Sequence, residues 1–259
     1  MKREVFDARN NFVVQSNNFI QKSKFDLTFA EQRALRYIIS KVKPHSDELE
    51  YVFDIREYAK VCGLDCDAGV VYEDTKKALQ NIRNKSWWFK GEDESETLVA
   101  FFSKARMDKR SGKVKVRFDE DMIPHIINLL NNYTQYPLIN TLAMKSVYST
   151  RIYELLLSLS WRAKSTKVKE HTEVFCLNYL KGALNVHEVA SYKNFSLFRA
   201  KVLIPAQREI NQYTDIEINY TPSKKGRKVV ELEISIKYKN YVEAHKSWVS
   251  SNEILDGNV

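Results

Sequence analysis

Residues 196–237, SLFRAKVLIPAQREINQYTDIEINYTPSKKGRKVVELEISIK, contain the pattern that decides the fold. The apolar residues first recur at helical spacing, which predicts a helix over Ser196–Tyr213. They then alternate in two runs, which predicts strands over Ile216–Tyr220 and Val229–Lys237 joined by the basic turn KKGRK. Pro205 lies inside the predicted helix, so we expect a kink or a restart of the helix there.

The predicted helix has an apolar face and a polar face. With about 100° of turn per residue, the apolar face carries Phe198, Val202, Leu203, Ala206, Ile210 and Tyr213. The opposite face carries Lys201, Arg208, Asn211 and Gln212. Arg199 falls on the apolar side by this count, so it either faces a phosphate from the first turn or extends past the apolar face into solvent. A helix divided in this way can pack on a core while its cations face DNA.

The same order of elements occurs earlier in the chain. The strand-like run Tyr51–Ile55 (YVFDI) is similar to Glu173–Leu177 (EVFCL), which lies 122 residues later, and each run leads into a short predicted helix. Each strand is preceded by a longer helix, predicted over Thr28–Lys41 and over Ser146–Ala163. The order helix, strand, helix, basic helix and cationic hairpin is therefore present twice, and this repeat predicts two domains.

The first copy contains its own basic amphipathic helix and basic hairpin. The helix is predicted over Val71–Asn84, and its polar face carries Lys76, Lys77, Gln80 and Arg83. Strand-like runs follow at Trp87–Phe89, Leu98–Phe102 and Lys113–Phe118. The hairpin cations are Lys104, Arg106, Lys109, Arg110 and Lys113 in the first copy, and Lys224, Lys225, Arg227 and Lys228 in the second. Such a helix or turn alone is most often a solvated surface, but their repetition in one order favours DNA contact.

We therefore predict an α+β fold with two tandem winged-helix domains, each a helix-turn-helix followed by a β wing, related by internal pseudo-symmetry. The boundary is predicted near Tyr136–Pro137, after a helix over Asp119–Asn131. The N-terminal winged helix then comprises residues 1–135 and the C-terminal one residues 136–241. Residues 242–259 have a weak pattern and are predicted to form a mobile tail.

The charge balance favours a polyanionic partner. The 259 residues include 41 basic and 33 acidic side chains, a net charge of +8. Residues 1–135 hold 23 basic and 21 acidic side chains, a net +2, whereas residues 136–259 hold 18 and 12, a net +6. The second half is therefore predicted to make the tighter contact with nucleic acid.

The cysteines and the first residues indicate a cytoplasmic protein. Cys62, Cys66 and Cys176 are odd in number and form no CxxC pair, so we expect reduced thiols and neither a disulfide framework nor a zinc ribbon. The start, MKREVFDARNNF, lacks the apolar core of a signal peptide, and no run approaches the roughly 18 apolar residues of a membrane span. We therefore expect no membrane contact.

The sequence predicts no catalytic residue, metal site or cofactor. It contains no GxxxxGK[ST] motif for the phosphates of a nucleotide. Its histidines are isolated, so the His-x-His metal pair of a nicking enzyme is absent: His45, His125, His171, His187 and His245. The acidic run Asp119–Asp121 opens a predicted helix and is better explained by capping than by metal binding. We expect a binding protein and not an enzyme.

Three segments resemble a known family. They are QSNNFIQKSKFDLTFAEQRALRYIIS (15–40), YPLINTLAMKSVYSTRIYELLLSL (136–159) and NFSLFRAKVLIPAQREINQYTDIEINYTPSKKGRKVVELEISIK (194–237). With the order of elements, which spans Val14–Lys239, they resemble the initiator Rep proteins of iteron-containing, theta-replicating bacterial plasmids. The phrase IPAQREINQYTDIEI followed by KKGRKV is characteristic of that family's second winged helix.

The resemblance implies a function at a plasmid origin. A monomer would bind directly repeated iterons in double-stranded DNA, and a homodimer would bind an inverted-repeat operator and repress the chain's own gene. Bound copies would help to open an AT-rich segment for the host initiator and helicase. The C-terminal unit would make the main iteron contact, and the N-terminal unit would contribute to dimerisation and to a second groove. On this chain the main contact would fall to Lys193, Arg199, Lys201, Arg208, Lys224, Lys225, Arg227 and Lys228.

Two other interpretations stay open. A double winged-helix transcriptional regulator without a role in replication would show the same helices and basic hairpins. A replication nickase would need a nucleophilic tyrosine, and the chain has 14 tyrosines, although the apolar stripes that carry Tyr37, Tyr153 and Tyr213 favour packing for these. The DNA target distinguishes the first alternative, and a covalent tyrosine–DNA adduct distinguishes the second.

Overall fold

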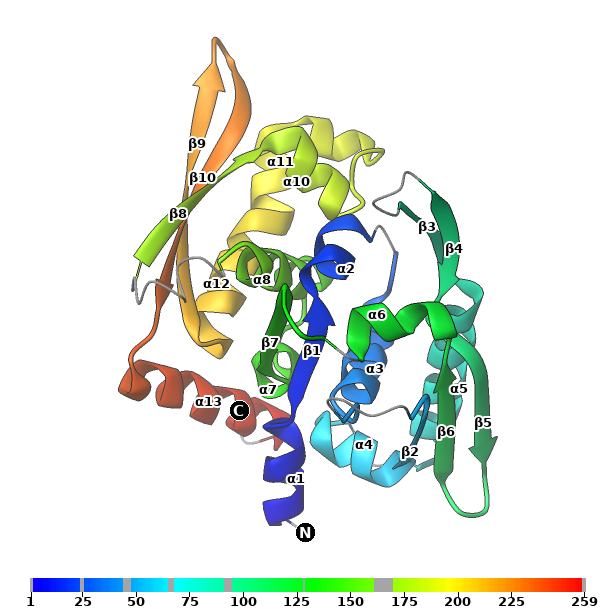
Figure 1. Ribbon diagram of the computed structural model, residues 1–259. Coiled ribbons are helices and arrows are strands. Elements are labelled where there is room, and N and C mark those ends of the chain that lie inside the picture. Colours follow the sequence, from blue (N-terminus) through cyan, green and yellow to red (C-terminus); the bar gives the residue numbers. More distant parts are fainter. Residues whose placement is uncertain are drawn as a thin grey trace.

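In the computed structural model, two winged-helix units lie on either side of a central junction (Figure 1). The structure describes residues 2–23, 26–43, 48–64, 68–90, 95–127, 129–160 and 170–257. Cys66 and the predicted helix end at 161–163 lie outside the described residues.

The first unit has the predicted order of a helix, a strand, two helices and a hairpin. Its elements are α3 (Phe29–Ile39), β2 (Glu50–Asp54), α4 (Ile55–Val61), α5 (Ala68–Asn84), β3 (Ser86–Lys90), β4 (Glu96–Ala100), β5 (Phe102–Asp108) and β6 (Lys113–Phe118). Helix α3 begins with the predicted capping box between Thr28 and Glu31. Strands β2, β6 and β5 form an antiparallel sheet in that order, and β3 pairs with β4 in a separate hairpin.

The second unit repeats this topology. Its elements are α8 (Val147–Leu159), β8 (Glu170–Cys176), α10 (Leu177–Ala183), α11 (Phe195–Phe198), a π-helical segment (Arg199–Leu203), α12 (Ile204–Tyr213), β9 (Ile216–Lys225) and β10 (Lys228–Tyr238). The sheet order β8-β10-β9 corresponds strand for strand to β2-β6-β5. The internal repeat predicted from the sequence is therefore confirmed at the level of strand pairing.

Between the units lies a junction made of segments from distant parts of the chain. Its elements are α1 (Lys2–Arg9), β1 (Phe12–Ser16), α2 (Asn17–Lys22), a 3-10 turn (Glu120–Met122), α6 (Ile123–Ile126), β7 (Tyr133–Pro137) and α7 (Ile139–Leu142). Strand β1 pairs antiparallel with β7. Helix α8 packs against α2 on one side and against α12 on the other. The predicted domain boundary between residues 135 and 136 thus falls inside strand β7, which is paired with β1. The boundary stays a prediction.

The predicted helix over Asp119–Asn131 is wrong. The Asp119 side chain caps a 3-10 turn by accepting a hydrogen bond from the backbone of Asp121, as expected for an acidic start. Helix α6 then has a single turn, because the chain becomes extended at Ile127 and adopts a left-handed conformation at Asn132. The chain must turn back here to pair β7 with β1, a long-range contact that local spacing does not report.

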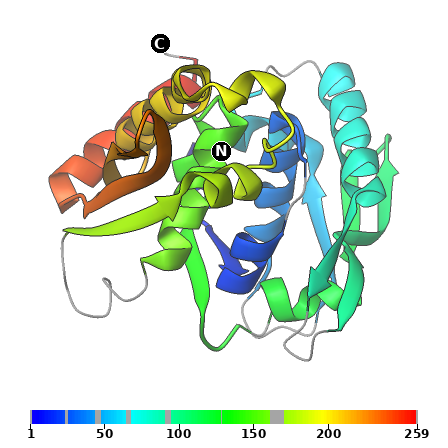
Figure 2. The same cartoon turned by 90° about the horizontal axis from the view of Figure 1, so that it is seen from above.

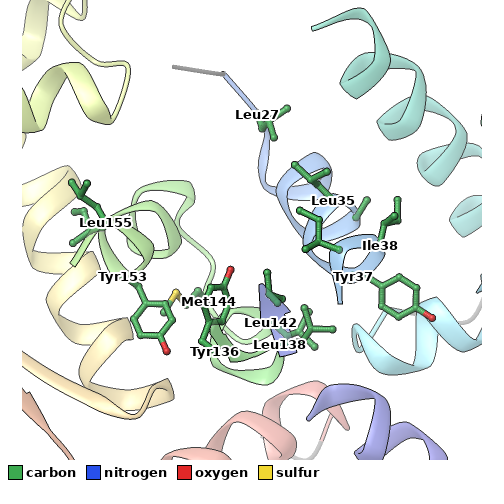
Figure 3. Packing of buried hydrophobic residues seen from close by; sticks show 14 of the residues in the cluster. Leu27, Leu35, Tyr37, Ile38, Tyr136, Leu138, Leu142, Met144, Tyr153 and Leu155 are labelled. Atoms are coloured by element: carbon green, nitrogen blue, oxygen red, sulfur yellow. The ribbon is translucent and has the colours of Figure 1, made fainter. Parts of the chain in front are cut away.

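The junction is closed by an apolar core with a buried polar network inside it. Figure 3 shows Tyr136, Tyr153 and Met144 packed together, and the two tyrosine rings lie 5.3 Å apart at their centroids. The Arg36 guanidinium forms a buried ion pair of 2.7 Å with Glu154, and Tyr136 donates a hydrogen bond to the same carboxylate. Burial alone would raise the pKa of the Glu154 carboxyl, but the charge and hydrogen bonds of Arg36 outweigh it and hold that pKa below its usual value.

Residues 242–257 lie in a packed helix and the turn that ends it, where a mobile tail was predicted. They contribute most of helix α13 (Tyr241–Leu255), which begins with a capping box between Asn240 and Glu243. Helix α13 packs against α7 and α12 and lies at the lower left of the molecule in Figure 1. Its buried positions include Ser247, Ser251 and Asn252, and this largely polar stripe explains why the apolar pattern is weak.

The end of α13 is tied to the first unit by Arg9, which is 1% exposed. The Arg9 guanidinium donates to the backbone carbonyls of Lys60 and Val61 at 3.1 and 2.9 Å, at the end of α4. It also donates to Asn252 Oδ1 at 2.7 Å and forms a 2.8 Å ion pair with Asp256. We call these contacts the Arg9 clasp. Through them α1, α4 and α13 meet at one point, although they come from the start, the first third and the end of the chain.

Candidate nucleic-acid interface

Helix α5 has the two faces that the sequence predicts. The buried face carries Val71, Thr75, Ala78, Leu79 and Ile82, and the exposed face carries Lys76, Lys77, Gln80 and Arg83. A groove runs between this exposed face and the neighbouring strand β5, and its walls include Tyr72, Lys76, Gln80, Arg83 and Lys104. The charged residues that line the groove are all cations, as expected of a surface that contacts a phosphate backbone.

The second basic helix is interrupted, as Pro205 predicts. Helix α11 passes into the π-helical segment and then into α12 with helical backbone angles throughout, and Pro205 lies in the first turn of α12. The predicted core positions are buried on both sides of the interruption: Phe198, Val202, Leu203, Ala206, Ile210 and Tyr213. Lys201 and Arg208 are exposed, so their predicted side of the helix faces solvent.

Two predicted DNA-contacting residues on this run have partners inside the protein. Asn211 is half-buried, donates to the carbonyl of Ile218 at 3.0 Å and accepts from the Ile218 N–H at 2.7 Å. Both polar atoms of its amide thus hold the start of β9, and the DNA contact of Asn211 stays a prediction. Arg199 is exposed and donates to the Tyr220 hydroxyl at 3.1 Å. The wider π turn changes the angular phase there, which the uniform count of 100° per residue ignored.

Both wings place their cations in solvent. In the second wing, Lys224, Lys225, Arg227 and Lys228 are exposed around Gly226, whose φ of +64° favours glycine. In the first wing, Lys109 and Arg110 are exposed near Gly112. Lys113 is exposed but lies 3.6 Å from the Asp54 carboxylate, which offsets part of its charge. Lys193 is also exposed, at the end of the 3-10 turn Ala190–Lys193.

The two basic helices lie on one side of the molecule. Seen from above, α5 and the α11–α12 run both occupy the upper part of Figure 2. The hairpins project in opposite directions in Figure 1, with β9–β10 pointing up and β5–β6 pointing down. The predicted contact residues therefore belong to two separate basic segments, one on each unit, whose helices lie on the same side of the molecule.

Sequence reasoning missed two cations on strand β6. Lys115 and Arg117 lie on the outer face of the β2-β6-β5 sheet, with side chains 47% and 40% exposed. The alternation KVKVRF, in which the valines and phenylalanine are buried, contains this information because alternate residues of a strand face opposite ways. These two cations were not predicted because only the cations close to the turn were assigned to DNA.

Three further findings concern metal ligands, thiols and membrane-spanning helices. Among the described residues, no group of three or more histidine, cysteine, aspartate or glutamate side chains could hold a metal ion. Cys62 is a buried free thiol and Cys176 an exposed one. None of the helices in the described ranges combines the length and the apolar character needed to cross a membrane.

Comparison with known proteins gives matches over both units. Residues 12–157 match the family described as Initiator Replication protein, WH1, and residues 170–236 match the description Initiator Rep protein, WH2. A replication initiation protein of Escherichia coli is 23% identical over 227 residues, which cover 84% of this chain and 67% of that protein. The crystal structure of Pi initiator protein in complex with iteron DNA superposes with a TM-score of 0.70 at 18% identity, covering 90% of this chain and 99% of that one.

The structural match supports the fold, and the two family matches cover well over half of the chain. They agree with the prediction of tandem winged helices in an initiator, a protein that acts by binding DNA. The chain belongs to the initiator replication protein family, with one winged-helix domain of the WH1 type and one of the WH2 type.

Proposed function

We propose that this protein initiates replication of a plasmid by binding iteron repeats at its origin. The observation that carries the proposal is the pair of exposed basic helices, α5 and α11–α12, on one side of a family member, each followed by a basic wing. A helix can enter the major groove and a wing can follow the backbone or the minor groove. The Pi initiator, which shares the fold, was crystallised on iteron DNA, and this supports the same target class here.

We assign the main contact to the second unit. Its exposed cations are Lys193, Arg199, Lys201, Arg208, Lys224, Lys225, Arg227 and Lys228. The first unit supplies a second contact through Lys76, Lys77, Gln80, Arg83, Lys109, Arg110 and Lys113. The excess of positive charge in residues 136–259 supports this order, since phosphate neutralisation supplies much of the affinity of such proteins.

The regulatory part of the proposal is that monomers bind the direct repeats and dimers bind an inverted repeat in the operator. The dimer represses the protein's own gene, and the origin-bound monomers act with the host initiator and helicase. The resemblance to plasmid initiators supports this scheme. A symmetric dimer matches an inverted repeat because its two halves are related by the same two-fold axis as the DNA site.

Footprinting on the DNA that flanks the gene tests the target. The purified protein is titrated on this DNA, with the Arg208→Ala variant as the loss-of-contact control and Lys246→Ala, an exposed position on α13, as the neutral control. The expected result is protection of tandem direct repeats by wild type and by the Lys246 variant at the same protein concentration, and by the Arg208 variant only at a concentration about 5- to 150-fold higher. Protection of a palindrome alone would identify a transcriptional regulator without a replication role, and a covalent tyrosine adduct on supercoiled DNA would identify a nickase.

A further inference from the structure

The outer face of the β2-β6-β5 sheet carries an unusual arrangement of charge. In the strand register, Arg106 on β5 lies opposite Lys115 on β6, and Lys104 lies opposite Arg117. Like charges directly opposite on one face of a sheet destabilise it. The next row toward the wing tip is balanced, because Lys113 lies between Asp54 and Asp108. The repulsive pairs are therefore confined to the two rows away from the tip.

These side chains surround a small hollow. Its walls are formed by Lys104, Arg106, Lys115, Arg117 and Glu50. Glu50 forms an ion pair with Lys115, and Arg117 lies 3.3 Å from the exposed carboxylate of Glu120. Among the described residues, Lys104 and Arg106 have no such acidic partner. The positive charge around the hollow also acts on the Glu50 carboxyl. The hydrogen bond from Lys115 lowers the pKa of this carboxyl, and the charges of Arg117 and Lys104 lower it further.

We propose that this hollow, on the outer face of the sheet, holds a phosphate group of the duplex DNA backbone and forms a DNA contact separate from helix α5 and the wing tip. The inference rests on the proposed DNA-binding function and extends it to residues outside the recognition helix. The cations would neutralise a phosphate without reading a base, so the contact adds affinity and fixes position but not sequence preference.

Continuity with the α5 groove favours DNA as the occupant. Lys104 lies in the wall of the hollow and also in the wall of the groove that Lys76, Gln80 and Arg83 line. Strand β5 is an edge strand of its sheet, and Lys104 on this strand connects the cations of the α5 groove with those of the outer face. A duplex lying along α5 can therefore reach the hollow with its backbone.

The composition of the face argues against a protein partner. Among the described residues of its two repulsive rows, Val52 is the one apolar side chain, at 55% exposure, and no aromatic ring accompanies it. Protein–protein interfaces have an apolar or aromatic centre from which charged residues are depleted. This face has the reverse composition, which is typical of surfaces that contact phosphates.

The double variant Arg106→Gln plus Lys115→Gln tests the proposal by the salt dependence of binding to origin DNA. We expect the slope of log K against log salt to fall by about one, because loss of the one phosphate contact removes roughly 0.9. The dissociation constants for origin DNA and for unrelated DNA should rise by the same factor, since no base contact is lost. Glu50→Gln should tighten binding to both DNAs, because it removes a carboxylate that repels phosphate.

Lys237→Gln is the matched control. Lys237 is 46% exposed and forms a cross-strand ion pair with Glu217 on the other sheet, so it resembles Lys115 in exposure and partner but lies outside the hollow. It should leave the salt slope unchanged. Thermal unfolding of each variant checks folding, and the double variant should unfold no earlier than wild type because it relieves repulsion.

An unchanged salt slope in the folded double variant would overturn the proposal, as would unchanged binding in the Glu50 variant. The Arg208→Ala variant separates this outcome from failure of the proposed function. If wild type binds origin DNA and only the Arg208 variant loses affinity, the function stands and the contact in the hollow is wrong. If wild type binds no origin DNA, the proposed function itself is wrong.

Discussion

Arg208 shows how a single exposed cation can be assigned a role by measurement. It lies on the exposed side of α12, opposite Ile210 and Tyr213, which are buried. Arg208→Ala should weaken binding to the origin by about 1–3 kcal/mol and relax specificity at one position if the side chain contacts a base. If it contacts a phosphate, the loss should be similar on all DNA and the salt slope should fall by about one. Unchanged affinity at several salt concentrations would exclude this side of α12 as a contact.

His125 gives the protein a predictable response to acid. It is buried, stacks on Phe19 and contacts the hydroxyl of Ser16 at 3.2 Å. Burial lowers its pKa from 6.5 to about 4, so the folded state disfavours the protonated imidazole. The unfolded chain therefore binds more protons than the folded protein below about pH 6.5. The free energy of unfolding should be highest above that pH and should fall by roughly 1–3 kcal/mol as the pH decreases toward 4.

Urea unfolding between pH 7 and pH 4.5 measures this effect. His125→Gln keeps a polar side chain but removes the titration, so the slope of stability against pH should become smaller in this window. Equal slopes for the variant and wild type would show that other groups control the response. Carboxylates with lowered pKa, such as Glu154, act at more acidic pH and do not interfere in the upper part of the window.

Among the contacts between elements, the side chain of Asn211 joins helix α12 to strand β9. Its two hydrogen bonds to Ile218 connect the last turn of α12 to the start of β9 and so set the direction in which the wing leaves the helix. Asn211→Ala should lower the free energy of unfolding by about 1–3 kcal/mol, because it removes the acceptor of the Ile218 N–H and leaves the Ile218 carbonyl with the Gln207 amide as its side-chain donor. Thermal or urea unfolding measures the loss, and exposed Gln212→Ala is the control.

The two faces of α5 and α12 could be predicted from the sequence because burial of an amphipathic helix follows local spacing. Val71, Ala78 and Ile82 recur at the helical period, and they are buried as expected. Asn211 could not be assigned in this way. Its angular position around the helix axis places Asn211 with the polar residues. Only the position of Ile218 on the neighbouring strand shows that the Asn211 amide is already hydrogen-bonded.

Helix α13 was missed for a related reason. It is buried through Ser247, Ser251 and Asn252, which leave no apolar stripe for a periodicity search to find. Lys239, just before it, donates to the carbonyl of Thr214 at 2.9 Å and to the Ser247 hydroxyl at 2.7 Å, which ties α13 to the end of α12. Polar contacts between distant segments hold this helix in place, and such contacts leave no signal at the level of local spacing.

At the scale of the whole molecule, the Arg9 clasp connects the two ends of the chain. Arg9→Ala should lower the free energy of unfolding by about 2–4 kcal/mol, because it removes the guanidinium that donates to the Val61 carbonyl and to the Asn252 amide oxygen in a buried site. Urea unfolding measures the loss.

Arg9→Lys should recover only part of this stability, since an ammonium cannot reproduce the planar fork of the guanidinium. Exposed Arg3→Ala is the control for loss of a cation from the same helix, α1. If Arg9→Ala unfolded at the same urea concentration as the Arg3 variant, the clasp would contribute nothing to stability.

Gly63 lies beside this clasp, and a Cβ atom there would approach the backbone oxygen of Leu255 to 2.5 Å. The last turn of the final helix thus rests directly on the backbone that follows α4. Because the chain closes on itself at this point, the span between α5 and α12 is set by the protein and not by a flexible linker. If α5 and α12 both contact DNA, as we propose, the two grooves of the site must lie at that span, so the spacing of half-sites along the duplex would be selected before any base is read.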